Sequence, residues 1–365
     1  MKSLGTGAPY PYRGNSLNLF RLVLAALVLF SHAFYIAGVP GSPAFNGENL
    51  GGWAVAGFFV VSGFLITRSR FRTPAGAFLV HRIARIFPAF LVCIVVTAFV
   101  FAPLALLLQG RGLDGFLTTP VTPFQYIWGN ITLYVHQYSI GTTLADVPYP
   151  DAWNGSLWTL FFEFFCYAIT WGLGAFALYR RSVVLVASVW MVSVVLRGVT
   201  GYGVTAGLDG DFVQLARLFS FFAAGALVFV IVDRWGLSRA VGVASIPVAA
   251  VLMACVPVIG GQLGAPFLAY ALLFLSTIVR QPRWVARNDV SYGFYIYAWP
   301  VQQLTLLAGG LALGFPGYIL VTVVVTFALA WLSWVLVERP AMARARGPRE
   351  VAGDIQSASA PTLRA

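Results

Sequence analysis

Two ionisable side chains, Arg21 and His32, lie within the first hydrophobic run of the chain, where a plain membrane anchor would carry neither. Eleven residues separate them, so on a helix they return to nearly the same face, about 16 Å apart along the axis. An ionisable group at bilayer depth costs on the order of 3 kcal/mol, which makes the pair a candidate functional site. The imidazole could act there as a general base. Alternatively, Arg21 extends to the membrane interface and His32 packs against another helix.

Glu163 is a second candidate, because it lies inside a later apolar run between Ser156 and Tyr167. We expect it in the same half of the membrane as His32. A carboxylate at that depth must be paired or protonated, and an imidazole partner would gain basicity and a fixed tautomer from the contact. An ion pair between Glu163 and Arg217 is the competing interpretation, and the sequence leaves both open.

A basic cluster between the second and third apolar runs is the third candidate. It consists of Arg68, Arg70, Arg72, His81, Arg82 and Arg85. Arg82 and Arg85 are three residues apart, on one face of an incipient helix at the end of a cytoplasmic loop. Two guanidinium groups so placed suit bidentate contacts with phosphates. Anchoring to anionic lipid would also explain the cluster, and the spacing does not decide between them.

The composition defines the elements that must position these residues. The chain has 365 residues, of which 59% are hydrophobic and 10% charged, so we predict an all-α polytopic membrane protein. About ten transmembrane helices are expected. They cover residues 17–37, 51–67, 84–108, 154–179, 182–200, 212–232, 240–259, 263–279, 290–308 and 315–337.

The distribution of basic residues predicts the orientation. With the amino terminus inside, 19 of the 23 Lys and Arg residues fall in cytoplasmic segments, so both termini are expected in the cytoplasm. Topology thus accounts for the net charge of +11, and no nucleic-acid partner is expected. Residues 1–345 form one predicted transmembrane domain, and residues 346–365 a disordered cytoplasmic tail. The segment 109–153 is expected outside and is long enough for a partly structured lid or re-entrant element. Its aromatic residues could stack on a sugar ring or lie in the interfacial belt.

Taken together, the motifs resemble the acyltransferase-3 family of membrane O-acyltransferases, in the stand-alone form that acetylates exopolysaccharides and other glycans. They occur in order over about residues 15–340. The matching motifs are Asn18-x-x-Arg21 with His32, Phe-Phe-Val-Val-Ser62-Gly-Phe-Leu, Arg82-x-x-Arg85-x-x-Pro88, Ser156-Leu-Trp158-Thr-Leu-x-x-Glu163, Ser291-Tyr292-Gly-x-Tyr-Ile and Glu338-Arg-Pro340. Many relatives carry a further histidine where this chain has Ala298-Trp299-Pro300, so no second histidine is expected there.

The resemblance implies transfer of an acyl group, usually acetyl, from cytoplasmic acyl-CoA to a hydroxyl of a glycan or other envelope molecule. His32 matches the family's essential histidine, Arg21 its partner and Glu163 the acid of the Ser-Leu-Trp motif, so these three are the predicted catalytic residues. Arg82 and Arg85 match the paired arginines, and we expect Arg68 and Arg72 to assist them in holding the donor. The adjacent glutamines of the ninth predicted span each need a hydrogen-bond partner or a ligand. The predicted substrate-binding residues are Asn18, Trp158, Ser291, Tyr292, Gln302 and Gln303.

The resulting hypothesis is a reaction across the membrane. The donor phosphates would bind at the cytoplasmic face, and the thioester would extend past Arg21 to His32. There it would meet an acceptor hydroxyl that enters from outside. Glu163 would orient the imidazole and favour its protonated form as His32 acts as general base. Direct transfer is preferred, and Ser62 or Ser156 as a transient acyl carrier stays open. The chain would lie in the inner, plasma membrane among lipid, without a metal. A transporter or flippase of a glycan or lipid-linked intermediate is the alternative, and the acceptor is not specified by the sequence.

Overall fold

A computed structural model describes residues 7–203 and 207–346, and it confirms the all-α class. The predicted tail therefore lies outside the described residues, apart from Arg346. The ten longest α-helices are α1 (Leu17–Ile36), α2 (Leu50–Arg72), α3 (Ala75–Val96), α6 (Trp158–Leu173), α8 (Val183–Gly201), α9 (Gly210–Trp235), α10 (Arg239–Cys255), α11 (Gly260–Ile278), α13 (Ser291–Leu307) and α14 (Gly314–Ser333).

Short elements connect or extend the long helices. A short antiparallel hairpin joins α1 to α2. Its strands, β1 (Ala44–Phe45) and β2 (Glu48–Asn49), have two residues each, and Ala44 pairs with Asn49. The other short elements are η1 (Thr97–Phe101), α4 (Ala102–Leu108), α5 (Pro123–Asn130), α7 (Ala177–Arg181), α12 (Arg283–Arg287), η2 (Gly310–Leu313), η3 (Trp334–Glu338) and α15 (Arg339–Ala345).

Each of the ten predicted spans overlaps one of these long helices. Within the described residues, seven helical segments are long and apolar enough to cross a membrane: 17–36, 50–72, 75–108, 183–201, 210–235, 260–278 and 310–345. The helices α6, α10 and α13 are shorter, at 16, 17 and 17 residues. The protein is thus a helical protein with several candidate membrane spans, while the count of about ten and the cytoplasmic termini stay predictions.

One predicted boundary is wrong at the basic cluster. The third span was expected to begin at residue 84 after a loop, whereas α3 begins at Ala75 and continues through η1 and α4 to Leu108. Pro74 precedes the first helical residue, and a proline is well tolerated at a helix start. His81, Arg82 and Arg85 therefore lie on a formed helix, which fixes the directions of their side chains.

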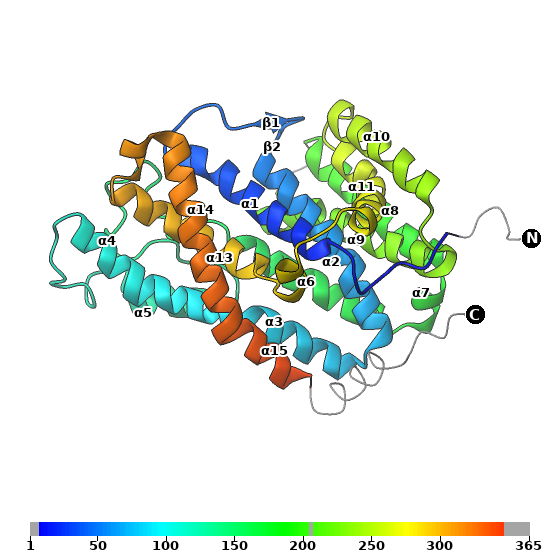
Figure 1. The fold of residues 1–365 in the computed structure, drawn as a ribbon, viewed down its shortest axis with the longest axis horizontal. Helices are drawn as coiled ribbons and strands as arrows, with labels where there is room; N and C mark the ends of the chain where they lie inside the picture. The colour runs from blue at the N-terminus through cyan, green and yellow to red at the C-terminus, as the bar shows by residue number, and fades with distance from the viewer. Residues whose placement is uncertain (1–6, 204–206, 347–365) are drawn as a thin grey trace, which may run out of the picture.

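The helices are arranged around a central pair, α1 and α2. Figure 1 shows this pair between two groups: α8 to α11 on one side, and α3 to α5 with α13 to α15 on the other. Extensive contacts join α2 to α9, α10 to α11, and α13 to both α1 and α14. Residues far apart in the sequence, from the two ends of the chain, consequently meet beside α1.

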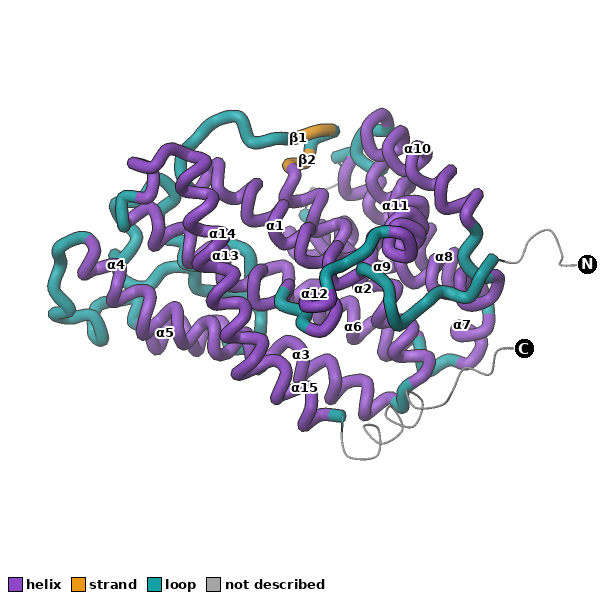
Figure 2. Tube along the Cα trace, in the orientation of Figure 1, coloured by secondary structure: helices purple, strands orange, loops and turns teal. Residues whose placement is uncertain are grey.

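The segment 109–153, predicted to lie outside, is partly structured. In Figure 2 the connection from α4 to α6 consists of loops interrupted by α5. A capping box between Thr122 and Gln125 begins that helix. Trp153 is fully buried and donates its indole N–H to Thr143 Oγ1 at 2.8 Å. Aromatic Trp128 is instead 71% exposed, so the segment both packs on the bundle and presents rings to its surroundings.

Two glycines permit the close crossing of α2 and α9. A Cβ atom at Gly63 would lie 1.9 Å from the carbonyl oxygen of Phe222, and one at Gly225 would lie 2.1 Å from that of Val60. Both obstacles are backbone atoms, which cannot rotate away. Small residues at such crossings allow helices to pack at short range in a membrane.

We expect Gly63→Ala to destabilise the protein by about 1–3 kcal/mol, because the added methyl forces α2 and α9 apart. The midpoint of thermal unfolding in detergent micelles would measure this loss. Gly172→Ala is the matched control, since a Cβ at that helical glycine meets nothing within 4 Å. Equal midpoints for the two variants would contradict the close crossing.

Candidate active site

Arg82 and Arg85 line a cavity of about 330 Å³, which we call the Arg82 cavity. Both project from the same face of α3, as their spacing predicted. His81 of α3 also lines the cavity. The other lining residues come from the segment before α13 and from the last described helical segments: Asp289, Trp334, Met342, Ala345 and Arg346. Three arginines face one carboxylate there, so the cavity is electropositive.

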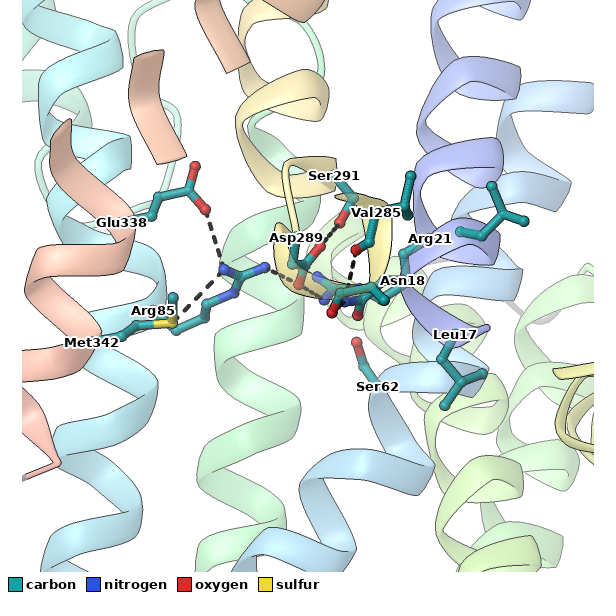
Figure 3. Close-up of polar contacts among 12 residues, drawn as sticks. Leu17, Asn18, Arg21, Ser62, Arg85, Val285, Asp289, Ser291, Glu338 and Met342 are labelled. Atoms are coloured by element: carbon teal, nitrogen blue, oxygen red, sulfur yellow. Dashed lines mark hydrogen bonds and ion pairs between the residues drawn. The ribbon is translucent and has the colours of Figure 1, made fainter. Parts of the chain in front are cut away.

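A buried carboxylate, Asp289, connects this cavity to α1. It accepts a hydrogen bond from Arg85 Nη2 at 2.6 Å, a short ionic contact from Arg21, and a bond from Ser291 Oγ at 2.6 Å (Figure 3). Burial raises the pKa of Asp289, but Arg21 and Arg85 outweigh burial and hold it at about 2. The carboxylate is therefore ionised at neutral pH and joins the two arginines.

A second carboxylate, Glu338, extends the network to the last helical segment. Its Oε2 accepts from Arg85 Nη1 at 3.2 Å, and its Oε1 accepts from Ser333 Oγ at 3.0 Å. The Glu338 side chain is fully buried. Arg85 thus lies between two carboxylates, as Figure 3 shows, and both of its terminal nitrogens are used.

Arg82 has no such partner. Within the described residues it makes no ion pair, and its Nε is buried without a hydrogen bond. A buried donor without an acceptor is costly, so this side chain is suited to an anion that enters the cavity. The Arg82 cavity therefore has the charge and the free donors of an anion site.

Next along α1 lies a narrow cavity of about 40 Å³, the Glu163 cavity, lined by Arg21 and Glu163. Glu163 Oε1 accepts hydrogen bonds from Ser62 Oγ at 2.8 Å and from Tyr167 OH at 2.6 Å. The Glu163 cavity is large enough for a water molecule or two and is too narrow for an acyl chain. Ser291 and Tyr292, two predicted substrate-binding residues, also line this cavity.

The predicted contact between Glu163 and His32 is wrong. The imidazole Nδ1 lies 3.3 Å from Ser156 Oγ instead. Glu163 follows Ser156 by seven residues, nearly two helical turns, which places it about 10 Å further along the bundle. The competing pair with Arg217 is also absent, because Arg217 makes a short ion pair with Glu48.

His32 lines a third cavity, the His32 cavity, of about 290 Å³. Trp299 packs on the imidazole with ring centroids 4.9 Å apart, and Tyr35 with centroids 5.3 Å apart. Within the described residues, no group hydrogen-bonds His32 Nε2. Trp158, another predicted substrate-binding residue, lines the same cavity. A ring fixed at Nδ1 and open at Nε2 is arranged as a general base requires.

The three cavities follow one another through the bundle. The His32 and Glu163 cavities share Val55, Thr159 and Tyr295 as lining residues. Tyr295 OH lies 2.6 Å from Thr159 Oγ1 at this shared wall. The Glu163 and Arg82 cavities meet at the Arg21–Asp289 ion pair. An anion site at one end is thus linked to an imidazole at the other.

Arg68 and Arg72 do not join Arg82 and Arg85. The Arg68 guanidinium lies 3.8 Å from the centre of the Tyr12 ring, and Arg72 pairs with Asp233 at 2.8 Å. Neither lines the Arg82 cavity. Their position on α2 rather than α3 separates them from the paired arginines, which spacing along the chain did not reveal.

Three predicted substrate-binding residues instead hold backbone groups. Asn18 donates to the carbonyl of Val285 at 3.3 Å, and Gln302 donates to that of Leu29 at 2.9 Å. Gln303 donates to the carbonyl of Ala152 at 3.1 Å and to that of Tyr149. None of the three lines the cavities described above. The protein itself therefore pairs the amide N–H donors of both glutamines, while each Oε1 is buried without a hydrogen-bond partner among the described residues.

Two carboxylates of this site had no predicted role. Asp289 directly precedes the predicted span 290–308, and Glu338 was noted only as part of the Glu338-Arg-Pro340 motif. A signal was present, because both are acidic residues in segments otherwise dominated by arginine, next to predicted span ends. Ser156 was considered only as an acyl carrier, whereas its hydroxyl contacts the imidazole.

Comparisons with known proteins define the class. A family model described as an acyltransferase domain matches residues 15–336. The chain is 32% identical over 353 residues to an O-acetyl transferase of Shigella phage Sf6, covering 91% of this chain and 97% of that protein. It is 31% identical over 365 residues to nodulation protein 10 of Rhizobium leguminosarum bv. viciae, covering 90% and 93%. No solved structure matches the chain.

The protein is therefore a membrane-type O-acyltransferase. It belongs to the acyltransferase-3 family, as its motifs indicated.

We expect Asp289→Asn to lower the free energy of unfolding by roughly 3–5 kcal/mol, because it leaves Arg21 and Arg85 without their shared counterion. Thermal unfolding in lipid nanodiscs measures the change. Asp233→Asn removes the exposed Arg72–Asp233 pair and should cost at most about 1 kcal/mol. Equal effects of the two substitutions would contradict the role of Asp289 as the shared counterion.

Proposed function

We propose that this protein moves an acyl group, acetyl in the first instance, from acyl-CoA on the cytoplasmic side to a hydroxyl of a cell-surface glycan. The observation that carries the proposal is the row of three cavities between Arg82 and His32. The name O-acetyl transferase of the phage relative supports acetyl as the group and oxygen as the acceptor. The protein would act in the plasma membrane.

The Arg82 cavity would bind the phosphates of the donor. Its arginines outnumber its single carboxylate, and Arg82 has unused donors. Guanidinium groups bind phosphate oxygens through paired hydrogen bonds. The acyl arm would then extend about 16 Å along α1, from Arg21 to His32.

Donor binding must widen the passage. In the structure the Arg21–Asp289–Arg85 network lies between the Arg82 and Glu163 cavities. A phosphate that competes for Arg85 would weaken its bond to Asp289 and free the segment before α13. Glu163 lines this path, and we propose that the hydrogen bonds from Ser62 and Tyr167 fix its carboxylate at the wall of the passage.

His32 would act as the general base at Nε2. With the Nδ1 proton donated to Ser156 Oγ, Nε2 carries the lone pair that takes the proton of the acceptor hydroxyl. The hydroxyl oxygen forms a bond to the thioester carbonyl carbon, and the carbon–sulfur bond breaks. The imidazolium returns its proton to the thiolate, which leaves as free CoA. Direct transfer needs no acyl-enzyme.

His32→Ala should reduce acetyl transfer at least about 10²-fold, because a general base contributes that much or more. The assay is release of free CoA by purified protein in nanodiscs, with and without a glycan acceptor. His136→Ala is the control, since His136 lines none of the three cavities. Transfer that survives in His32→Ala would remove the assigned role, and glycan movement without CoA release would favour a transporter.

Arg82→Ala should raise KM for acetyl-CoA by about tenfold or more, since a hydrogen bond to a charged group contributes about 1.5–3 kcal/mol. Steady-state kinetics at saturating acceptor measure this value. Arg68→Ala serves as the matched control, because Arg68 packs on Tyr12 outside the cavity. A larger KM effect from Arg68→Ala than from Arg82→Ala would place the donor elsewhere.

A further inference from the structure

A fourth cavity adjoins the His32 cavity and has no role in the mechanism above. This Arg197 cavity has a volume of about 290 Å³ and shares Glu48, Gly52 and Arg217 with the His32 cavity. The Glu48–Arg217 ion pair forms part of their common wall. A molecule that places one unit at His32 can therefore place its neighbouring unit in the Arg197 cavity.

Hydrogen bonds and ring stacking fix the residues that line the Arg197 cavity. Asn46, at the turn of the β1–β2 hairpin, donates to the carbonyls of Met253 and Val256, each at 2.7 Å. The hairpin consequently joins the end of α10, and Figure 1 shows these elements at the same end of the bundle. Trp53 stacks on Phe45 with ring centroids 4.8 Å apart and forms an aromatic wall.

Two polar side chains in this cavity lack partners. Gln262 is 4% exposed, and its Oε1 is buried without a hydrogen bond. Arg197 makes no ion pair within the described residues, and its Nε is likewise buried without a partner. Since buried polar groups are normally satisfied, both side chains are suited to a ligand with hydroxyl and anionic groups.

The charge of the cavity identifies the anionic group. Arg217 is neutralised by Glu48, so Arg197 supplies one uncompensated positive charge. A carboxylate carries one negative charge and matches the planar guanidinium, whereas a phosphate monoester carries nearly two. Gln262 Oε1 can accept a hydrogen bond from a ring hydroxyl. A sugar that carries both a carboxylate and hydroxyls satisfies every unpaired group.

We propose that the Arg197 cavity binds an acidic sugar, a uronic acid, as the unit of the acceptor adjacent to the one that is acylated at His32. This assignment deepens the proposed function and rests on it for the role of the neighbouring cavity. The Arg197 cavity would thereby select anionic glycans over neutral ones, separately from the acyl transfer step.

The test is a binding titration of the full-length protein in nanodiscs without acyl donor. The probes are cellobiouronic acid, which carries a glucuronate, and neutral cellobiose. We expect the wild-type protein to bind the acidic disaccharide about tenfold more tightly than the neutral one. Arg197→Gln should abolish this preference. Arg111→Gln, which removes the same charge at a residue bonded to Thr142, should retain it.

Gln262→Leu guards against misfolding of the arginine variant, because it keeps the charge of the cavity. We expect it to weaken binding of both disaccharides several-fold. An unchanged preference in folded Arg197→Gln, or unchanged affinities in Gln262→Leu, would overturn the proposal. Tighter binding of glucose 1-phosphate than of cellobiouronic acid would overturn the assignment to a carboxylate. Because no donor is present, failure of His32 as the base would leave these results unchanged.

Discussion

The bridge from Asp289 to Arg21 and Arg85 is the interaction on which the rest of the site depends. It joins α1, which carries His32, to α3, which carries the anion site, through the segment that begins α13. A charge buried in a helical bundle is tolerated only with a partner, so the three side chains fix one another. Glu338 extends the bridge to the end of α14 and its continuation. These ion pairs thereby fix the position of the Arg82 cavity relative to His32, the two ends of the proposed reaction path.

The same bridge separates the Arg82 cavity from the Glu163 cavity, and this gives it a second consequence. Buried ion pairs contribute little net stability compared with apolar packing. The free energy rises steeply, however, when one partner of such a pair is left without the other. An incoming phosphate offers Arg85 another anion, so binding of a donor and widening of the passage become one event. Until then the acyl arm would be kept out of the path, since the Glu163 cavity is only about 40 Å³ in volume.

The sequence predicted those parts of the site that depend on one helix, because helical geometry is regular. The face shared by Arg21 and His32 and the pairing of Arg82 with Arg85 need only residue spacing, and the apolar runs likewise predicted the long helices. Residue spacing does not predict which side chains of different helices come into contact. Glu163 accepts a hydrogen bond from Ser62 of α2 and does not contact His32, because the relative depth of residues on different helices depends on how those helices pack. Gln302, similarly, bonds to a backbone carbonyl that only the fold brings near.

The most direct measurement of the central claim is an experimental structure in nanodiscs with a non-reactive thioether analogue of acetyl-CoA. The account predicts phosphate density against Arg82, an Arg85 released from Asp289, and the acetyl group next to His32 Nε2. Binding of the analogue at another surface, with the Arg21–Asp289–Arg85 network intact and the three cavities empty, would contradict it.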